Sequence, residues 1–408
     1  MPASDPPASR IGAPGDRVNS QVLLGLLVSL GAFGVDAMLP ALASMGRAFG
    51  VGETRAQLVV GVYLLGFSAG QLLFGPLSDA WGRRRVLLAG LAAFWALSGA
   101  VAAFRDFSYL LAARTLQGVF AASLRTVGTA WVRDRYRGES MARVMALVQS
   151  VFVVAPVLAP WVGAYLVRWG WQAVFLFLAT TGALLWVWAL AALEESLPLK
   201  ARRPLAWRSL WEAVRLVGSR RELVAAVLAL GSTYGMLYAY LVSAPQLYKT
   251  HLRLSNEAFA LAFAGTALFQ LVAMLVTRAL VVRVGLRRLV WSTAAYLFVV
   301  TGLLPLHASG WSSPWGLWLH ISLVFFGITL TFPNATSLAL EPLGSVAGFA
   351  SSALGFASTF LAGLLGNALG QWSGGDPVRF ALGWVVLAAL SLAATQWAVA
   401  GGREVPVR

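Results

Sequence analysis

The sequence predicts an all-α polytopic membrane protein with 12 transmembrane helices in two six-helix bundles. Of its 408 residues 59% are apolar and only 12% are charged, and the mean hydropathy is +0.74. A soluble chain carries roughly a quarter charged residues. Because one bilayer crossing takes about 20 apolar residues, 12 crossings occupy about 240 residues and leave room for loops and two short tails.

Six nearly uncharged stretches fill the first half of the chain and are the first six predicted helices. They cover residues 18–46, 56–78, 86–104, 107–132, 144–167 and 169–193. Three charged residues interrupt them: Asp36 in the first stretch, and Arg114 and Arg125 in the fourth.

The second half repeats this pattern after a basic segment. Its apolar stretches cover residues 223–248, 258–277, 289–375 and 380–402. The third stretch is far too long for one helix, and we expect it to be divided into three at Pro305, Ser309–Pro314 and Glu341–Gly344. The expected organisation is therefore a disordered tail at 1–17, a bundle at 18–193, a linker at 194–221, a second bundle at 222–402 and a tail at 403–408.

The basic residues orient these helices. With both termini in the cytoplasm, 22 Arg and Lys residues lie on the inner side, seven lie outside and two lie within the fourth helix. This asymmetry obeys the positive-inside rule. It also accounts for most of the net charge of +15 without a nucleic-acid partner. The first 17 residues lack the apolar core and cleavage site of a signal peptide.

Part of the linker has helical periodicity. Its apolar residues face away from its basic ones and are Trp207, Leu210, Trp211, Val214 and Val217. This spacing is typical of a helix that lies on the inner membrane surface. A solvated connector is the alternative.

Several classes of chemistry are excluded by missing residues. The chain has no Cys and three scattered His, so we expect no metal centre and no cofactor. Its two lysines, Lys200 and Lys249, follow Leu199 and Tyr248 rather than Gly, which excludes a phosphate-binding Gly-Lys-Ser/Thr loop and hence ATP as the energy source. A membrane enzyme is a remote alternative, because the spans contain no catalytic cluster of His, Cys or paired carboxylates.

An internal repeat relates the two halves. The segment Trp81–Leu88 reads WGRRRVLL, and Val284–Trp291, about 200 residues later, reads VGLRRLVW. Each segment connects the second and third predicted helix of its half. A parallel repeat of this kind places a substrate site at mid-membrane between the halves.

Five motifs occur in order along the chain. They are DAMLPAL (Asp36–Leu42), GPLSDAWGRRRVL (Gly75–Leu87), R-x-x-Q-G (Arg114, Gln117 and Gly118), APVLAPWVGA (Ala155–Ala164) and FPNATSLALEPLGSVAG (Phe332–Gly348). In these motifs the chain resembles the major facilitator superfamily, its twelve-helix drug:proton antiporters and, among them, the Bcr/CflA-type multidrug exporters. The similarity runs from about residue 20 to about residue 400.

The resemblance implies the major facilitator fold and two devices for conformational change. The second motif implies a gate formed by Gly75, Asp79, Gly82 and Arg83, for which a stop-transfer cluster of arginines is the alternative. The fourth motif implies a hinge, formed by Pro156, Pro160 and Gly163. Ordinary bending at the two prolines is the alternative for the hinge.

The charges inside the membrane are the candidates for proton coupling. An intramembrane charge costs several kcal/mol, so it normally faces a cavity or an opposite charge. Asp36 and Arg114 lie at similar depth near the outer ends of the first and fourth helices, and we expect them to pair. We interpret Asp36 as the proton carrier; a permanently ionised partner of Arg114 is the alternative.

Other residues are candidates for the substrate cavity. Arg125 follows Arg114 on almost the same helix face, where it either lines the cavity or extends its side chain to the inner interface. The remaining candidates are Gln117, Phe120, Tyr234, Tyr238, Gln270 and Asn334. For the last four, which lie in the second half, a packed residue is the alternative. One acid and two bases favour neutral, zwitterionic or anionic substrates.

The sequence therefore predicts a proton-coupled secondary transporter that exports small amphiphilic drugs or metabolites by alternating access. An exporter of a single metabolite and an uptake permease are the alternatives within this fold. We expect a monomer in a bacterial inner membrane, with protons, a small-molecule substrate and the lipid bilayer as its partners.

Overall fold

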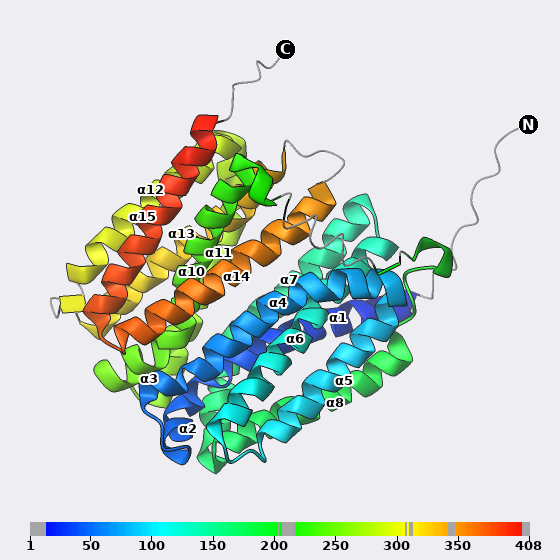
Figure 1. Ribbon diagram of the computed structural model, residues 1–408, viewed down its shortest axis with the longest axis horizontal. Coiled ribbons are helices and arrows are strands. Elements are labelled where there is room, and N and C mark those ends of the chain that lie inside the picture. Colours follow the sequence, from blue (N-terminus) through cyan, green and yellow to red (C-terminus); the bar gives the residue numbers. More distant parts are fainter. Residues whose placement is uncertain are drawn as a thin grey trace, which may run out of the picture.

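The computed structural model describes residues 14–202, 204–205, 215, 217–306, 308–309, 313–341 and 347–401, and throughout these residues the regular structure is helical (Figure 1). The first bundle contains α1 (Pro14–Asp36), α4 (Leu58–Trp81), α5 (Arg83–Val101), α6 (Phe107–Arg135), α7 (Gly138–Leu166) and α8 (Trp171–Ala192). The second bundle contains α10 (Arg221–Pro245), α11 (Asn256–Val284), α12 (Leu286–Leu306), α13 (Pro314–Leu340), α14 (Ala347–Ser373) and α15 (Pro377–Gly401). Short elements join them: η1 (Leu39–Ala41), α2 (Leu42–Ala48), α3 (Glu53–Ala56), η2 (Val167–Trp169), η3 (Leu199–Ala201) and η4 (Gln246–His251).

The lengths of these helices confirm the predicted polytopic fold. Among the described residues, 11 helical segments are long and apolar enough to cross a membrane. Helix α6 has 29 residues, and the polar side chains of Arg114, Gln117 and Arg125 lower its hydropathy. The long stretch 289–375 is divided as expected, because α12 ends at Leu306, α13 spans Pro314–Leu340 and α14 begins at Ala347.

Local sequence signals explain where several helices begin. Asp106 accepts hydrogen bonds from the backbone N–H groups at the start of α6, the shorter from Ser108 at 2.7 Å, and Ser313 does the same for α13. These are N-caps, which satisfy donors that have no partner inside the helix. Gly82, between α4 and α5, and Gly285, between α11 and α12, have φ of 96° and 84°. The internal repeat therefore places a glycine with positive φ at the same turn in both halves.

The first predicted helix is interrupted, which the prediction of one span at 18–46 missed. Helix α1 ends at Asp36, and after a turn the chain continues as η1 and α2. Pro40 explains the break, since a proline clashes with the carbonyl four residues earlier, here that of Asp36. Helix α10, the first helix of the second half, also changes at its end, where it passes into the π-helical turn η4. The first helix of each half therefore departs from regular α-helix at the same end, and discontinuous helices are typical of transporter binding regions.

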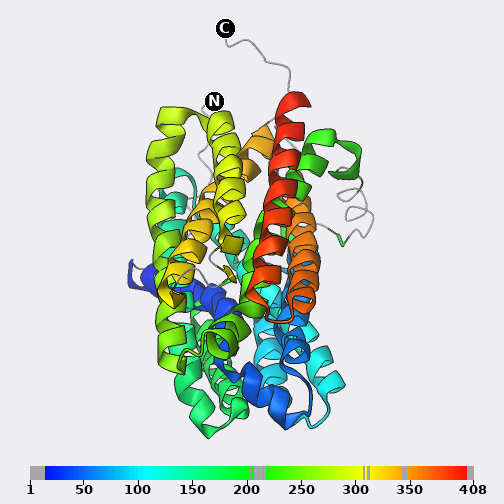
Figure 2. The ribbon, with the colours of Figure 1, turned by 90° about the vertical axis from the view of Figure 1, so that its left-hand side faces the viewer.

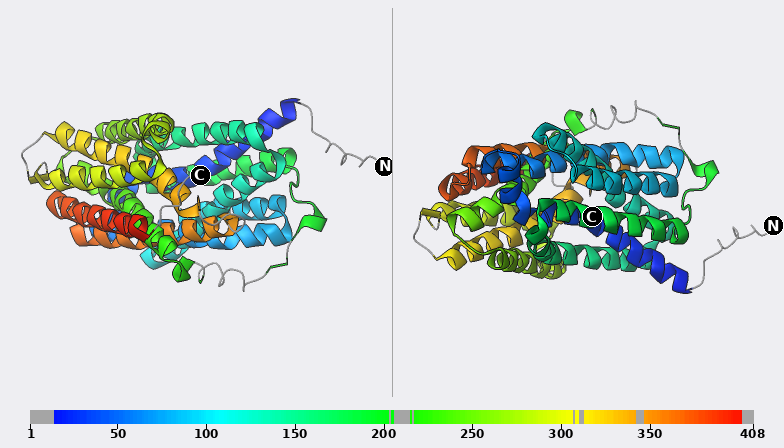
Figure 3. Two further views of the ribbon diagram at one scale, coloured as in Figure 1. Left: turned by 90° about the horizontal axis from the view of Figure 1, so that it is seen from above. Right: turned by 90° about the horizontal axis from the view of Figure 1, so that it is seen from below.

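The two bundles lie side by side with their helices roughly along one direction (Figure 2 and Figure 3). We call the end of the molecule that contains α2 and α3 the Gln57 end, and the end that contains the α4–α5 turn the Arg83 end. The bundles approach each other at the Gln57 end and diverge toward the Arg83 end (Figure 1). Across the interface α4 packs against α14, and α7 packs against α11.

The linker is only partly described. Four residues of its expected surface helix, Trp207, Leu210, Trp211 and Val214, lie outside the described residues. The fifth, Val217, is buried and packs with Leu223 and Ala353 of the second bundle. At this position the apolar side chain therefore contacts protein rather than a membrane surface.

Candidate transport site

Asp36 lies where the broken first helix meets both bundles. Its side chain is 5% exposed, and Asp36 is the last residue of α1. The carboxyl group is within electrostatic range of Tyr63 on α4 and of Tyr240 on α10. Helix α10 belongs to the second bundle, so a change of charge at Asp36 acts on both bundles.

Arg114 is fully buried beside this break and binds carbonyl oxygens instead of a carboxylate. Its Nη2 donates to the carbonyl of Gly34 at 3.0 Å and its Nε to the carbonyl of Val59 at 3.2 Å. The guanidinium also lies over the ring of Tyr63, 4.3 Å from its centroid. Among the ion pairs of the described residues none joins Arg114 to Asp36, so the structure does not contain the expected pairing.

The break in α1 gives the physical reason for this difference. In an uninterrupted helix the carbonyl of Gly34 would accept from the N–H of residue 38. Here the N–H of Met38 donates to Val35, which leaves the Gly34 carbonyl for Arg114. A cation at the C-terminal end of a helix is favourable because the helix dipole is negative there. Arg114 thus stabilises the turn that carries Asp36.

Gln117 is the partner of Arg114. It is fully buried, its Oε1 accepts from Nη1 of Arg114 at 2.5 Å, and its Nε2 donates to Oγ of Ser98 at 2.6 Å. In this structure the polar atoms of Gln117 are therefore already used within the first bundle, and its role in substrate binding stays a prediction. Phe120 is half-buried and packs on Phe74 of α4, with ring centroids 6.0 Å apart.

Arg125 differs from Arg114 although both lie on nearly the same face of α6. Arg125 is exposed, and its guanidinium lies 5.6 Å from the ring centroid of Phe152 on α7. It is within electrostatic range of Tyr234 and Tyr238, which α10 contributes from the second bundle. The structure therefore brings three of the predicted cavity residues together across the interface.

The two remaining cavity candidates lie on other helices of the second bundle. Asn334 on α13 is 5% exposed, and its Nδ2 donates to the carbonyl of Leu330 in the same helix at 2.6 Å. Gln270 is half-buried on α11. Asn334 has the geometry of a packed residue, which was the alternative for it.

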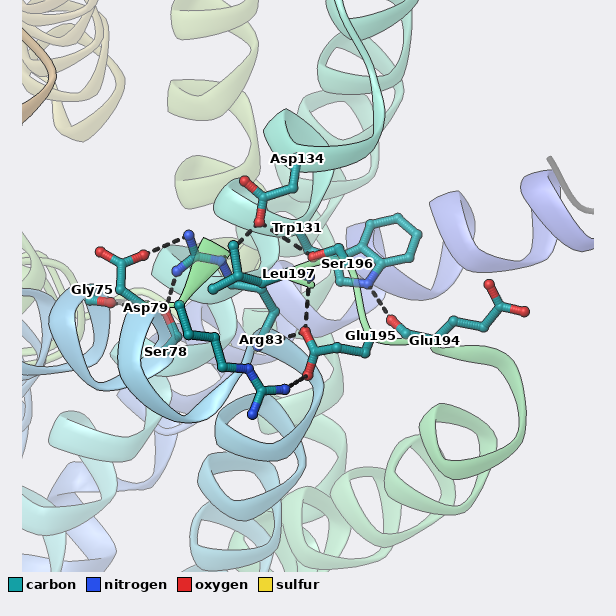
Figure 4. Close-up of polar contacts among 11 residues, drawn as sticks. Gly75, Ser78, Asp79, Arg83, Trp131, Asp134, Glu194, Glu195, Ser196 and Leu197 are labelled. Carbon is teal, nitrogen blue, oxygen red and sulfur yellow. Dashed lines mark hydrogen bonds and ion pairs between the residues drawn. The ribbon is translucent and has the colours of Figure 1, made fainter. Parts of the chain in front are cut away.

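The predicted gate residues form a charged cluster within the first bundle (Figure 4). Arg83 at its centre is nearly buried, and contacts Asp79 at 2.6 Å and Asp134 of α6 at 2.9 Å. It also donates to Oγ of Ser78 at 2.6 Å, and its backbone N–H donates to Oε1 of Glu195 at 2.8 Å. A Cβ at Gly82 would meet the carboxylate end of Glu195 and displace it, and the φ of 96° at Gly82 favours glycine there. The cluster joins α4, α5, α6 and the segment after α8.

The predicted hinge residues lie on α7, which runs without a break through Pro156 and Pro160. Gly163 faces the break in α1, where an added Cβ would overlap the backbone carbonyl of Ala37. Glycine therefore lets α7 approach the residue that follows Asp36.

Polar contacts between the bundles gather at the Gln57 end. Gln57 donates to Gln246 at 2.5 Å, Gln371 donates to the carbonyl of Thr54 at 2.8 Å, and Nζ of Lys249 donates to the carbonyl of Pro40 at 3.1 Å. The contact of Lys249 with Pro40 joins η4 to the break in the first helix. Sequence reasoning did not find these residues, because polar side chains near the ends of spans carry no specific signal.

Two six-helix bundles that meet at one end, with a buried carboxyl group at their junction, are the architecture of the alternating-access secondary transporters. The chain matches the model of the Major Facilitator Superfamily over residues 23–367. It therefore belongs to the Major Facilitator Superfamily.

Similar proteins span nearly the whole chain. The chain is 28% identical to multidrug resistance protein D of Escherichia coli, covering 86% of this chain and 88% of that protein. It is 24% identical to a bicyclomycin resistance protein homolog of Haemophilus influenzae, with 89% and 92% covered. The xylose transporter XylE of E. coli superposes with a TM-score of 0.73 at 13% identity, over 97% of this chain and 99% of that one, which shows the shared fold.

Proposed function

We propose that the protein is a proton-coupled transporter that exports small amphiphilic drugs or metabolites across a bacterial inner membrane. The names of the similar multidrug and bicyclomycin resistance proteins support the substrate class and the direction. The positive-inside asymmetry supports cytoplasmic termini. In this orientation the Arg83 end is cytoplasmic, and contacts at the Gln57 end hold the state that faces inward.

The observation that carries the proposal is the position of Asp36. A carboxyl group buried at the end of a broken helix is unfavourable when charged. Tyr63 of the first bundle and Tyr240 of the second are both within electrostatic range of this carboxyl group, which supports a proton site at the junction of the bundles. Release of that proton places a negative charge at this junction, and this charge favours a different arrangement of the two bundles.

The test uses Asp36→Asn in proteoliposomes with an imposed pH gradient. Radiolabelled chloramphenicol and bicyclomycin are the probes, and a protonophore collapses the gradient. We expect the wild type to move at least one probe against its gradient only while the pH gradient lasts. Asp36→Asn should abolish the pH-driven transport and still exchange probe for probe, because the amide cannot release a proton.

A matched control is Asp106→Asn, since Asn also caps a helix well and Asp106 is exposed at the start of α6. It should transport like the wild type. Full pH-driven transport by Asp36→Asn would move the proton site elsewhere. Transport that ignores the pH gradient in the wild type would favour a uniporter or permease.

A further inference from the structure

The direction in which Arg125 points follows from the exposure pattern of α6. Tyr109 and Leu116, in the first third of the helix, are 68% and 49% exposed. Nine residues separate Leu116 from Arg125, and at about 100° per residue this is two and a half turns, which places the two on opposite faces of the helix. Arg125 therefore points to the opposite side from the exposed apolar face, and Tyr234 and Tyr238 of the second bundle lie within electrostatic range of it.

Arg125 is also too deep to reach the membrane surface at the Arg83 end. Ten residues of α6 follow it before the helix ends at Arg135, which is about 15 Å at 1.5 Å per residue. Side chains on a helix lean toward its N-terminus, in this case away from the Arg83 end. The exposed guanidinium therefore lies in the interior of the transporter, where the diverging bundles leave it accessible.

No acid neutralises Arg125 in the described part of the chain. The ion pairs there involve Arg83, Arg135, Arg143, Arg168 and Arg202, and all of these lie near the two ends of the molecule. The second positive charge on the same face, Arg114, is bound to carbonyl oxygens. The interior around Arg125 therefore has a positive potential.

The surroundings of Arg125 are aromatic. Phe152 lies under the guanidinium, and Tyr234 packs on Phe332 of α13 with ring centroids 4.0 Å apart. Rings from both bundles thus border a cation whose five N–H donors suit a carboxylate or sulfonate. An aromatic ring that carries an acid group matches both features at once.

We propose that Arg125 is the specificity residue of the transport site, and that it selects amphiphilic substrates with an acid group attached to an aromatic ring. This proposal rests on the proposed function, because it assumes that the space between the bundles is the substrate site. It goes beyond that function by naming the chemical group that is recognised. Substrates with two fixed positive charges are excluded by the same potential.

The test compares two probes with one aromatic skeleton. 8-Anilinonaphthalene-1-sulfonate carries an acid group, and N-phenyl-1-naphthylamine is its neutral counterpart. Both fluoresce in apolar sites, and energy transfer from the 17 tryptophans distinguishes probe bound to protein from probe in lipid. Binding is measured with the full chain in nanodiscs, and empty nanodiscs give the background.

We expect the wild type to bind the sulfonate more tightly than the amine. Arg125→Gln should weaken sulfonate binding about 10- to 100-fold, the value of a charge-assisted hydrogen bond, and leave amine binding unchanged. Arg125→Lys should fall between the two, because it keeps the charge and loses the forked geometry. The control Arg379→Gln removes an exposed cation at the Gln57 end and should bind both probes like the wild type.

Three results would overturn the proposal. The first is an equal loss of affinity for both probes in Arg125→Gln. The second is an affinity for the sulfonate that Arg125→Gln leaves unchanged. The third is the absence of saturable sulfonate binding by the wild type at millimolar concentration. Failure of the proposed function is seen separately, as transport of any probe that does not depend on the pH gradient. Selective sulfonate binding through Arg125 without proton coupling would refute the transport mechanism and keep this inference.

Discussion

Replacing Arg83 by Gln tests whether the charged cluster at the Arg83 end stabilises the first bundle. The side chain of Arg83 is 5% exposed, while its partners Asp134 and Asp79 are 18% and 43% exposed. Removing one member of a buried pair costs about 3–5 kcal/mol because the other charge stays behind. Water reaches Asp79 and stabilises it, so most of the cost comes from Asp134. We therefore expect a loss of about 3 kcal/mol, at the lower end of that range.

The assay is thermal unfolding of the purified protein in detergent, followed by tryptophan fluorescence and by loss of the monodisperse peak. For a long chain 1 kcal/mol corresponds to about 2 °C, so the apparent Tm should fall by about 6 °C. The control is Arg143→Gln, whose pair with Glu139 is 79% and 91% exposed. Pairs of this kind contribute little, and its Tm should change by less than about 1 °C.

A double variant separates two effects of Arg83→Gln: the loss of its attraction to the carboxylates, and the cost of the charge on Asp134 that is left without a partner. Adding Asp134→Asn to Arg83→Gln removes the carboxylate that has lost its partner, and we expect it to restore part of the lost Tm. Equal Tm values for Arg83→Gln and Arg143→Gln would refute the reasoning, because burial would then make no difference to the cost.

Two further predictions concern the contacts between helices. The chain has no cysteine, and the side chains of Gln57 and Gln246 touch across the bundles. A short bifunctional methanethiosulfonate reagent should therefore crosslink Gln57→Cys with Gln246→Cys and stop transport, and reduction should restore it. Each single variant is the control, and transport by the crosslinked protein would show that this end need not open. Gly163→Ala places a methyl group against the backbone of Ala37, whereas a Cβ at Gly302 meets nothing within 4 Å. Gly163→Ala should lower stability by about 1–3 kcal/mol, and Gly302→Ala should be neutral or stabilising. Equal apparent Tm values would contradict the tight packing of α7 on the break in α1.

The sequence predicts the helices well because bilayer thickness and backbone hydrogen bonding leave few alternatives. It also contains the reason for the break after Asp36, namely Pro40 four residues later, although hydropathy alone joins the two segments. The spacing of Arg114 and Gln117 places them one turn apart on the same face, which is the signal that Gln117 serves Arg114. By contrast, the other partners of Arg114 are backbone carbonyl groups. Every residue has a carbonyl group, so the sequence does not indicate which ones Arg114 binds.

Contacts between distant residues are the part that the sequence alone does not provide. Arg83 is recognisable from its motif, but its partners are Asp134 of α6 and Glu195 of the segment after α8, 51 and 112 residues away. Likewise the joining of Gln57 to Gln246 depends on how the bundles meet, and a single sequence does not specify this. The exposure of Arg125 follows from the same arrangement.

Arg125 is exposed and Arg114 is fully buried, and this difference affects where the membrane voltage falls within the protein. Water that reaches Arg125 carries the potential of the solution at the Arg83 end into the protein. The membrane voltage then falls mainly over the sealed stretch beyond it, which begins with the roughly 16 Å of helix that separate the two arginines. Asp36 lies at the far end of these roughly 16 Å, beside Arg114. In the mechanism proposed above, a proton passes between Asp36 and the water around Arg125, so it crosses much of the voltage over only part of the bilayer thickness. A small rearrangement at this position then does electrical work.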